Sequence, residues 1–232
     1  MPNFVYNDLS IDGNAEDIAK LKAQMNTPFV DYIEANGDLA YGIKEIKYSN
    51  PVFSFRNIIA PTDLEAYKAQ PVRSELEWND PNRWADIKRI SETDNSWYNW
   101  NIRNWGVKWD VAVNDDEGYT ETELYDKGDT YLAYHFSTAW GIPEQAIKTL
   151  TTQYPNLKFT LSSEEENGWG GEWVFENGEY LTVSEYGWKC RECDHEEDEP
   201  TWCDDCEFDI CPSCGYNESS EPCNEHKENV DE

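Results

Sequence analysis

The chain has 232 residues, of which 38% are hydrophobic and 14% aromatic, enough to build a buried core and to exclude global disorder. Its 48 acidic and 18 basic residues give a formal net charge of −30, and such a field repels nucleic-acid phosphates and anionic lipids. It contains no apolar run of about 18 residues and does not begin with a basic segment followed by an apolar one, so we expect no transmembrane helix, no signal peptide and an intracellular location.

Apolar alternation and helical periodicity predict a series of strands and helices before residue 186. In chain order, we predict a strand at 4–11, a helix at 15–25, a strand or an extended entry segment at 51–55, a short helix at 63–69, and loop plus helix over the polar stretch 71–96. Further strands are predicted at 110–113, 130–137 and 157–161, with a helix over 143–154 that Pro143 opens. Asn177-Gly178 between residues 172–176 and 180–184 indicates a type I′ hairpin. This order favours an α+β fold with helices on one face of an antiparallel sheet.

An aromatic-rich segment, WYNWNIRNWGVKWD, occupies residues 97–110. Trp97, Trp100 and Trp105 recur at helical spacing, and Gly106 is expected to end the helix. We interpret the rings mainly as core packing, because each buries a large apolar area. The alternative is a surface that stacks on nucleobases or a small ligand.

The N-terminal part resembles the YubB-type ferredoxin-like domain family of phages and plasmids. The resemblance rests on four stretches that occur in order, MPNFVYNDLSIDG, PVFSFRNIIAP, WYNWNIRNWGVKWD and STAWGIPEQAIKTLTTQYPNL. It implies a ferredoxin-like α+β domain over residues 1–186, an origin in a mobile element and hence the cytosol of a bacterial host. It implies no iron–sulfur cluster and no established activity.

The remaining residues, 187–232, carry all seven cysteines, six of them in three C-x2-C pairs. With one histidine they make eight ligands, which suits two four-coordinate structural zinc ions. A crossed-brace arrangement assigns one ion to Cys190, Cys193, Cys211 and Cys214, and the other to Cys203, Cys206, Cys223 and His226. This acidic segment has few apolar residues to bury, so metal binding would supply its folding free energy.

The run from Trp202 to Cys211 resembles the ZZ-type zinc finger, through its C-x2-C pair followed by Phe208-Asp209-Ile210. Some ZZ fingers capture a free N-terminal amine on acidic side chains, and Glu207 and Asp209 stand at the matching positions. The chain departs from the family in having Cys223 where a histidine usually stands. It also has Arg191 where amine-binding members carry an acid, which opposes amine capture.

We expect no enzyme, because residues 1–186 contain a single histidine, His135, and no glycine-rich phosphate loop. Both zinc sites would also be closed to substrate. The hypothesis is a non-enzymatic phage or mobile-element protein that binds a basic protein partner, a host defence or DNA-processing factor, through its acidic surface. The acidity alone fits either solubility or mimicry of a polyanion. The alternative function is nucleic-acid or nucleotide binding by the aromatic-rich domain, which the charge disfavours.

Overall fold

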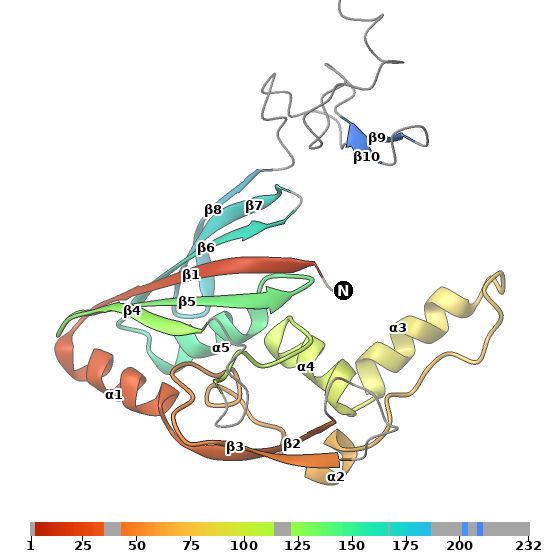
Figure 1. Ribbon diagram of the computed structural model, residues 1–232, viewed down its shortest axis with the longest axis horizontal. Helices are drawn as coiled ribbons and strands as arrows, with labels where there is room; N and C mark the ends of the chain where they lie inside the picture. Colours follow the sequence, from red (N-terminus) through yellow and green to blue (C-terminus); the bar gives the residue numbers. More distant parts are fainter. Residues whose placement is uncertain are drawn as a thin grey trace, which may run out of the picture.

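The computed structural model describes residues 3–34, 43–113, 122–166, 168–186, 201–203 and 208–210 (Figure 1). Its strands are β1 (Phe4–Asp12), β2 (Phe29–Glu34), β3 (Ile43–Tyr48), β4 (Glu123–Lys127), β5 (Tyr131–Ala139), β6 (Lys158–Glu165), β7 (Gly170–Glu176), β8 (Glu179–Tyr186), β9 (Thr201–Cys203) and β10 (Phe208–Ile210). Its helices are α1 (Ala15–Met25), α2 (Leu64–Tyr67), α3 (Arg83–Thr93), α4 (Trp97–Trp105) and α5 (Glu144–Gln153).

A six-stranded sheet in the order β4-β5-β1-β6-β7-β8 forms the centre of the fold, and every pairing in it is antiparallel. Side chains alternate along β1, so Val5, Leu9 and Ile11 are fully buried while Phe4 and Tyr6 are exposed. The helices and the β2–β3 hairpin lie on one side of the sheet (Figure 1). The expected α+β architecture, an antiparallel sheet with helices on one face, is therefore confirmed.

Two amphipathic helices cover the packed face of the sheet. In α1, Asn14 accepts a hydrogen bond from the backbone N–H of Asp17 as N-cap, and Ile18, Leu21 and Met25 are buried. In α5 the buried residues also recur at helical spacing, and Pro143 precedes the first turn as predicted. The core joins these helices to inward-facing strand residues, among them Tyr134, Phe136, Phe159, Leu161 and Trp173. Burial of this apolar surface is the main stabilising contribution to the domain.

The aromatic-rich segment forms α4, which ends where the sequence predicts. Gly106 adopts φ = 88° and its backbone N–H donates to the carbonyl of Ile102, a left-handed C-cap. A Cβ at this glycine would stand 3.0 Å from the carbonyl oxygen of Ile142, so α4 approaches the loop before α5 closely. The β7–β8 turn is also as predicted, with Asn177 at φ = 51° and Gly178 at φ = 82°.

Two predicted strands are wrong. Residues 51–55 and 110–113 form no strand, because backbone N–H groups in both segments donate to the carboxylate of Asp110 and not to a neighbouring strand. Among the described residues, five strands lie where we predicted none, namely β2, β3, β4, β9 and β10. Asp31 lies buried within β2, and a buried carboxylate obscures the alternation by which a strand is recognised.

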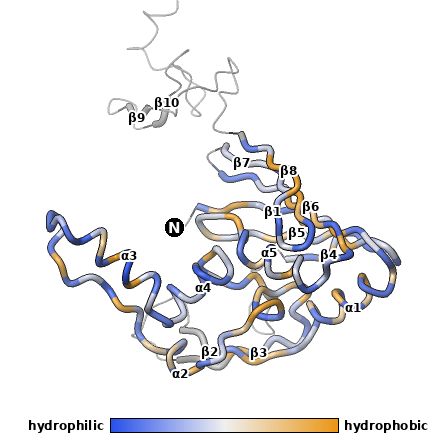
Figure 2. The backbone as a smooth tube through the Cα atoms, turned by 180° about the vertical axis from the view of Figure 1, so that it is seen from behind, coloured by the Kyte–Doolittle hydropathy of each residue, from blue (hydrophilic) through white to orange (hydrophobic). Residues whose placement is uncertain are grey.

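Helix α3 extends away from the body together with the segment that precedes it (Figure 1). This arm is largely hydrophilic (Figure 2), although Trp78 and Trp84 are 79% and 72% exposed. The guanidinium of Arg83 lies over the Trp78 ring at 5.3 Å, and it also donates to the carbonyl of Leu76. These tryptophans therefore lie outside the hydrophobic core.

Candidate functional site

The six-stranded sheet has one face that no described element covers, which we call the open face. Its members follow from the register of the strands, because directly paired residues project from the same side of a sheet. Asp8 of β1 pairs with His135 of β5 and with Ser162 of β6, so these three side chains share the open face. The same alternation extends to β4 through Glu123, which pairs with His135.

The open face is strongly acidic. The register places on it the carboxylates of Asp8, Asp12, Glu123, Asp126, Glu164, Glu172 and Glu176, all of which are exposed. Among the described residues, the basic side chains on this face are His135 and Lys158. His135 is already engaged, since its Nδ1 lies 3.1 Å from Oδ1 of Asp8. The face therefore presents a negative field to solvent.

Tyrosines are interspersed with these carboxylates. Tyr6, Tyr125 and Tyr131 are 42%, 51% and 37% exposed. Tyr131 donates to Oδ1 of Asp126 at 3.0 Å, and this hydrogen bond is the main cause of a raised pKa for Tyr131. Desolvation raises the pKa of Tyr125, and the nearby charge of Asp8 adds to the effect. Tyr125 and Tyr131 thus stay protonated and can donate hydrogen bonds at neutral pH.

An aromatic cage lies where α4 approaches the loop between β5 and α5. The ammonium of Lys108 lies 4.2 Å from the ring centroid of Trp109, 4.4 Å from that of Trp140 and 5.9 Å from that of Tyr98. We define the aromatic cage as Tyr98, Trp109 and Trp140. Trp140 is 51% exposed, so the cage is open to solvent on one side. The ammonium of Lys108 is attracted to these rings, because a ring face is negative and attracts positive charge.

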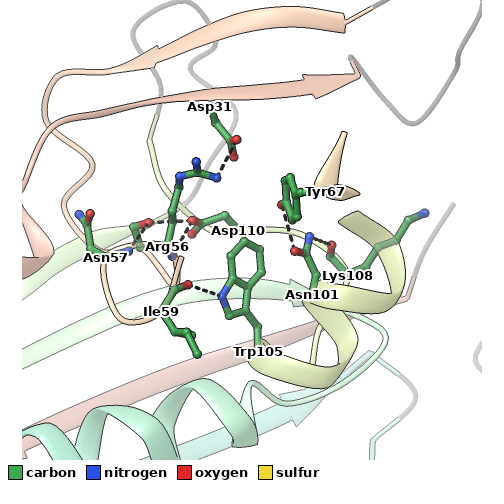
Figure 3. A network of polar contacts seen from close by, with 10 residues as sticks. Asp31, Arg56, Asn57, Ile59, Tyr67, Asn101, Trp105, Lys108 and Asp110 are labelled. Atoms are coloured by element: carbon green, nitrogen blue, oxygen red, sulfur yellow. Dashed lines mark hydrogen bonds and ion pairs between the residues drawn. The ribbon is translucent and has the colours of Figure 1, made fainter. Parts of the chain in front are cut away.

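A network of polar contacts fixes the backbone beneath the cage (Figure 3). The carboxylate of Asp110 accepts hydrogen bonds from the Ser54 hydroxyl at 2.7 Å and from the backbone N–H groups of Phe55, Arg56, Val111 and Ala112 at 2.7–3.2 Å. Desolvation raises the pKa of Asp110, and these hydrogen bonds act in the opposite direction. Asp110 therefore joins residues 54–56 to the segment that carries Lys108 and Trp109.

Three further hydrogen bonds belong to this network. The guanidinium of Arg56 donates to Oδ1 of Asp31 at 2.8 Å, and this ion pair is almost fully buried. Tyr67 donates to Oδ1 of Asn101 at 3.0 Å, and Asn101 in turn donates to the carbonyl of Lys108 at 2.8 Å. Desolvation raises the pKa of Tyr67. Figure 3 shows the side chain of Lys108 pointing away from the network that holds its backbone.

The tryptophans that we singled out as weak ligand candidates lie mostly in the interior. Trp105 is fully buried and donates from Nε1 to the carbonyl of Ile59 at 3.1 Å, so no base can stack on it. Trp100 packs edge-on against Trp105 at 5.5 Å and belongs to the rim of the core. Trp97 is half-buried beside Tyr98. The three rings do not form one accessible stacking surface.

Most of the predicted zinc module lies outside the described residues. This applies to the ligands Cys190, Cys193, Cys206, Cys211, Cys214, Cys223 and His226, and to Glu207. The backbone is described for Cys203, which ends β9 and pairs with Phe208 of β10, and for Asp209 within β10. Within the described part of the chain, no group of three or more His, Cys, Asp or Glu side chains is placed to hold a metal ion.

Sequence reasoning did not identify the open face or the cage. The alternation of Phe4, Tyr6 and Asp8 is a signal for the open face, because it shows aromatic and acidic residues on the side of β1 opposite the core. The cage has no comparable signal, since Trp140 comes from a different loop from Lys108 and Trp109. None of the helices in the described ranges is both long enough and apolar enough to span a lipid bilayer.

Comparison with known proteins supports the ferredoxin-like domain. Residues 108–204 match a family described as "Ferredoxin-like domain in Api92-like protein". This chain is similar to the crystal structure of protein api92 from Yersinia pseudotuberculosis, with 10% identity and a TM-score of 0.45. The similarity covers 82% of the present chain and all of the api92 chain. No curated protein matches the chain. The family that matches is the Api92-like one, and the match does not extend to the YubB-type family that we named from the sequence. The resemblance of residues 202–211 to a ZZ-type finger remains an interpretation of the sequence.

Proposed function

We propose that the chain is a non-enzymatic protein of a phage or similar mobile element that binds a basic protein partner through its open face. By this binding it inhibits or redirects a host protein, one that acts in defence or in DNA processing. The observation that carries the proposal is the gathering of exposed carboxylates and tyrosines on the sheet face that no described element covers. Tyrosine is enriched at protein interfaces, and complementary charge speeds the association of partners.

The same face argues against the alternative, nucleic-acid binding by the domain. Affinity for nucleic acid depends mainly on lysines and arginines that neutralise phosphates. Among the described residues, the basic groups of the open face are Lys158 and His135, which is paired with Asp8, and they are outnumbered by the carboxylates. Trp105 is too deeply buried to stack on a base. We expect no mobility shift with single-stranded or duplex DNA at low salt. A shift that weakens on substitution of Lys158 would favour the alternative.

The proposal is tested by capture of a partner from a bacterial host lysate, followed by measurement of its affinity for matched charge variants. The open-face variant is Glu123→Gln, Glu164→Gln and Glu172→Gln, and the control variant is Glu65→Gln, Glu75→Gln and Glu92→Gln. Both variants lower the negative charge by three, and all six residues are exposed. We expect the open-face variant to weaken binding by about tenfold at low salt and the control variant much less. Equal affinities for the two variants would refute the open face as the binding surface.

We further propose that residues 187–232 form a crossed-brace, ZZ-like module with two zinc ions. The regular C-x2-C spacing supports it, and so does the β9–β10 pairing, in which Cys203 pairs with Phe208 directly before Asp209. The module would be a second protein-binding surface, with Glu207 and Asp209 as candidate contacts for a basic peptide. The ions would be structural, because four protein ligands each leave no position for water or substrate.

A further inference from the structure

Within the described part of the chain, the ammonium of Lys108 contacts aromatic rings and no carboxylate. Its ammonium has no acidic partner within ion-pair distance among the described residues, although the chain has 48 acidic residues. The described lysines Lys20 and Lys148, by contrast, each pair with a carboxylate in their own helix. Desolvation lowers the pKa of Lys108. The faces of Trp109 and Trp140 are thus the main favourable contacts of this charge.

The two tryptophans are held by contacts that do not involve the Lys108 side chain. Trp140 has φ = 67°, and its backbone N–H donates to the carbonyl of Asn3 at 3.0 Å. Trp109 lies between Lys108, whose carbonyl accepts from Asn101, and Asp110, whose carboxylate is fixed by its five donors. A flexible lysine side chain can therefore leave the cage without removing the contacts that position the rings.

We infer that Trp109 and Trp140, with Tyr98 at the edge, form a binding site for alkylammonium ligands that the side chain of Lys108 occupies in the free protein. The structure places an ammonium 4.2 and 4.4 Å from the ring centroids of two tryptophans, which is within the range of a cation–π contact. The ligand class is a primary ammonium of a basic chain or, better suited, a quaternary ammonium. A methylated ammonium loses less hydration on entering an aromatic site than an unmethylated one.

Lys108 competes with the ligand for the same position. An incoming cation must displace the lysine ammonium and then share the neighbourhood with a like charge, so affinity is lower in the wild-type chain than in a chain that lacks the lysine. The net charge of −30 favours cation entry in both cases. The side chain of Lys108 therefore acts as an internal competitor, and the fraction of time it spends in the cage sets the affinity of the cage for an alkylammonium ligand.

The test is a titration of the full chain with tetramethylammonium chloride against sodium chloride at equal ionic strength, followed by NMR of the tryptophan indole N–H groups. We compare wild type, Lys108→Ala, and Lys108→Ala combined with Trp140→Leu. Lys20→Ala is the matched control, because it removes the same charge from a helix surface without any ring contact. We expect Lys108→Ala to bind about tenfold more tightly than wild type and than Lys20→Ala, through the signals of Trp109 and Trp140. The double variant should lose this binding.

Three outcomes would overturn the inference. These are equal affinity of Lys108→Ala and wild type, absence of saturable binding in every variant, and binding that survives Trp140→Leu. Thermal unfolding of each variant accompanies the titration, and Lys108→Gln replaces Lys108→Ala if the latter unfolds. The readout uses a small cation and no protein partner, so its result is independent of whether the open face binds a partner.

Discussion

Replacement of Asp110 tests whether one carboxylate holds the backbone beneath the cage. Its Oδ2 accepts from the Ser54 hydroxyl at 2.7 Å and from the Arg56 N–H at 3.0 Å, and its Oδ1 accepts from three further backbone N–H groups. In Asp110→Asn the amide oxygen keeps those three donors, whereas the amide NH2 faces the other two. In Asp110→Ala all five donors lose the carboxylate.

The magnitude follows from the number of donors left without an acceptor. A hydrogen bond to a charged group is worth about 1.5–3 kcal/mol, so the loss of two gives a cost of about 3 kcal/mol for Asp110→Asn. Asp110→Ala should cost about 4 kcal/mol or more, since water can replace only part of the lost contacts at this partly buried position. Asp12→Asn, the same change at an exposed site, should stay within about 0.5 kcal/mol.

The assay is urea unfolding followed by circular dichroism, with a double-mutant cycle between Ser54 and Asp110. Ser54→Ala alone should cost about 1–2 kcal/mol. In the Asp110→Asn background it should cost clearly less, because the hydroxyl has then lost its bond to a charged acceptor and keeps only neutral hydrogen bonds, such as the one it accepts from the Asn57 N–H. If the free-energy costs of Ser54→Ala and Asp110→Asn add within about 0.5 kcal/mol, the Ser54–Asp110 contact is refuted. If Asp110→Asn costs no more unfolding free energy than Asp12→Asn, the stabilising role of the carboxylate is refuted.

Four other predictions concern buried side chains and the zinc module. Tyr134→Phe should be neutral or stabilising, because the buried Tyr134 hydroxyl has no hydrogen-bond partner among the described residues, whereas Tyr67→Phe should cost about 1 kcal/mol through loss of its bond to Asn101. Burial raises the pKa of Tyr134, so the unfolded state ionises first and wild type loses stability as the pH rises above the usual tyrosine pKa of 10.0. Tyr134→Phe should therefore lose less stability than wild type in alkaline urea titrations. Trp105→Ala should cost about 3–5 kcal/mol in the same assay and Trp84→Ala within about 0.5 kcal/mol, since the first ring is fully buried and the second is 72% exposed. Metal analysis of the purified full chain should give two zinc ions, and chelation should leave the unfolding transition of the first domain unchanged; one ion or none would contradict the two-site assignment.

The elements that the sequence predicts correctly are those whose local pattern agrees with their tertiary environment. The alternation of β1 matches a strand with one packed face, and the spacing of Ile18, Leu21 and Met25 matches a helix with one buried stripe. Prediction failed where a polar side chain takes the place of an apolar one. Asp31 is buried in β2 because Arg56 reaches it from another segment, and no local pattern signals that ion pair.

The candidate sites show the same division. The composition of the open face can be read from β1 alone, because one strand already displays an aromatic and acidic side opposite an apolar one. The cage cannot be predicted from any one segment of the sequence. It depends on the close approach of α4 to the loop before α5 at Gly106, and on the positive φ of Trp140. The WGVKWD motif supplies the cation and one ring, whereas the tertiary fold supplies the second tryptophan ring.

The cage lies beside one end of the open face, where β1 begins and β5 ends. Phe4 pairs with Ala139, the residue before Trp140, and the N–H of Trp140 donates to the carbonyl of Asn3. A basic chain that binds along β1 and β5 therefore passes close to a site suited to one of its own ammonium groups.

If both proposals hold, removal of Lys108 should strengthen binding of the captured partner and removal of Trp140 should weaken it. Lys108→Ala would then increase affinity for a basic partner by more than Lys20→Ala, although both variants make the chain more acidic by the same charge. A purely electrostatic surface would respond equally to the two changes, so the difference between them separates binding in the cage from general attraction to the acidic field.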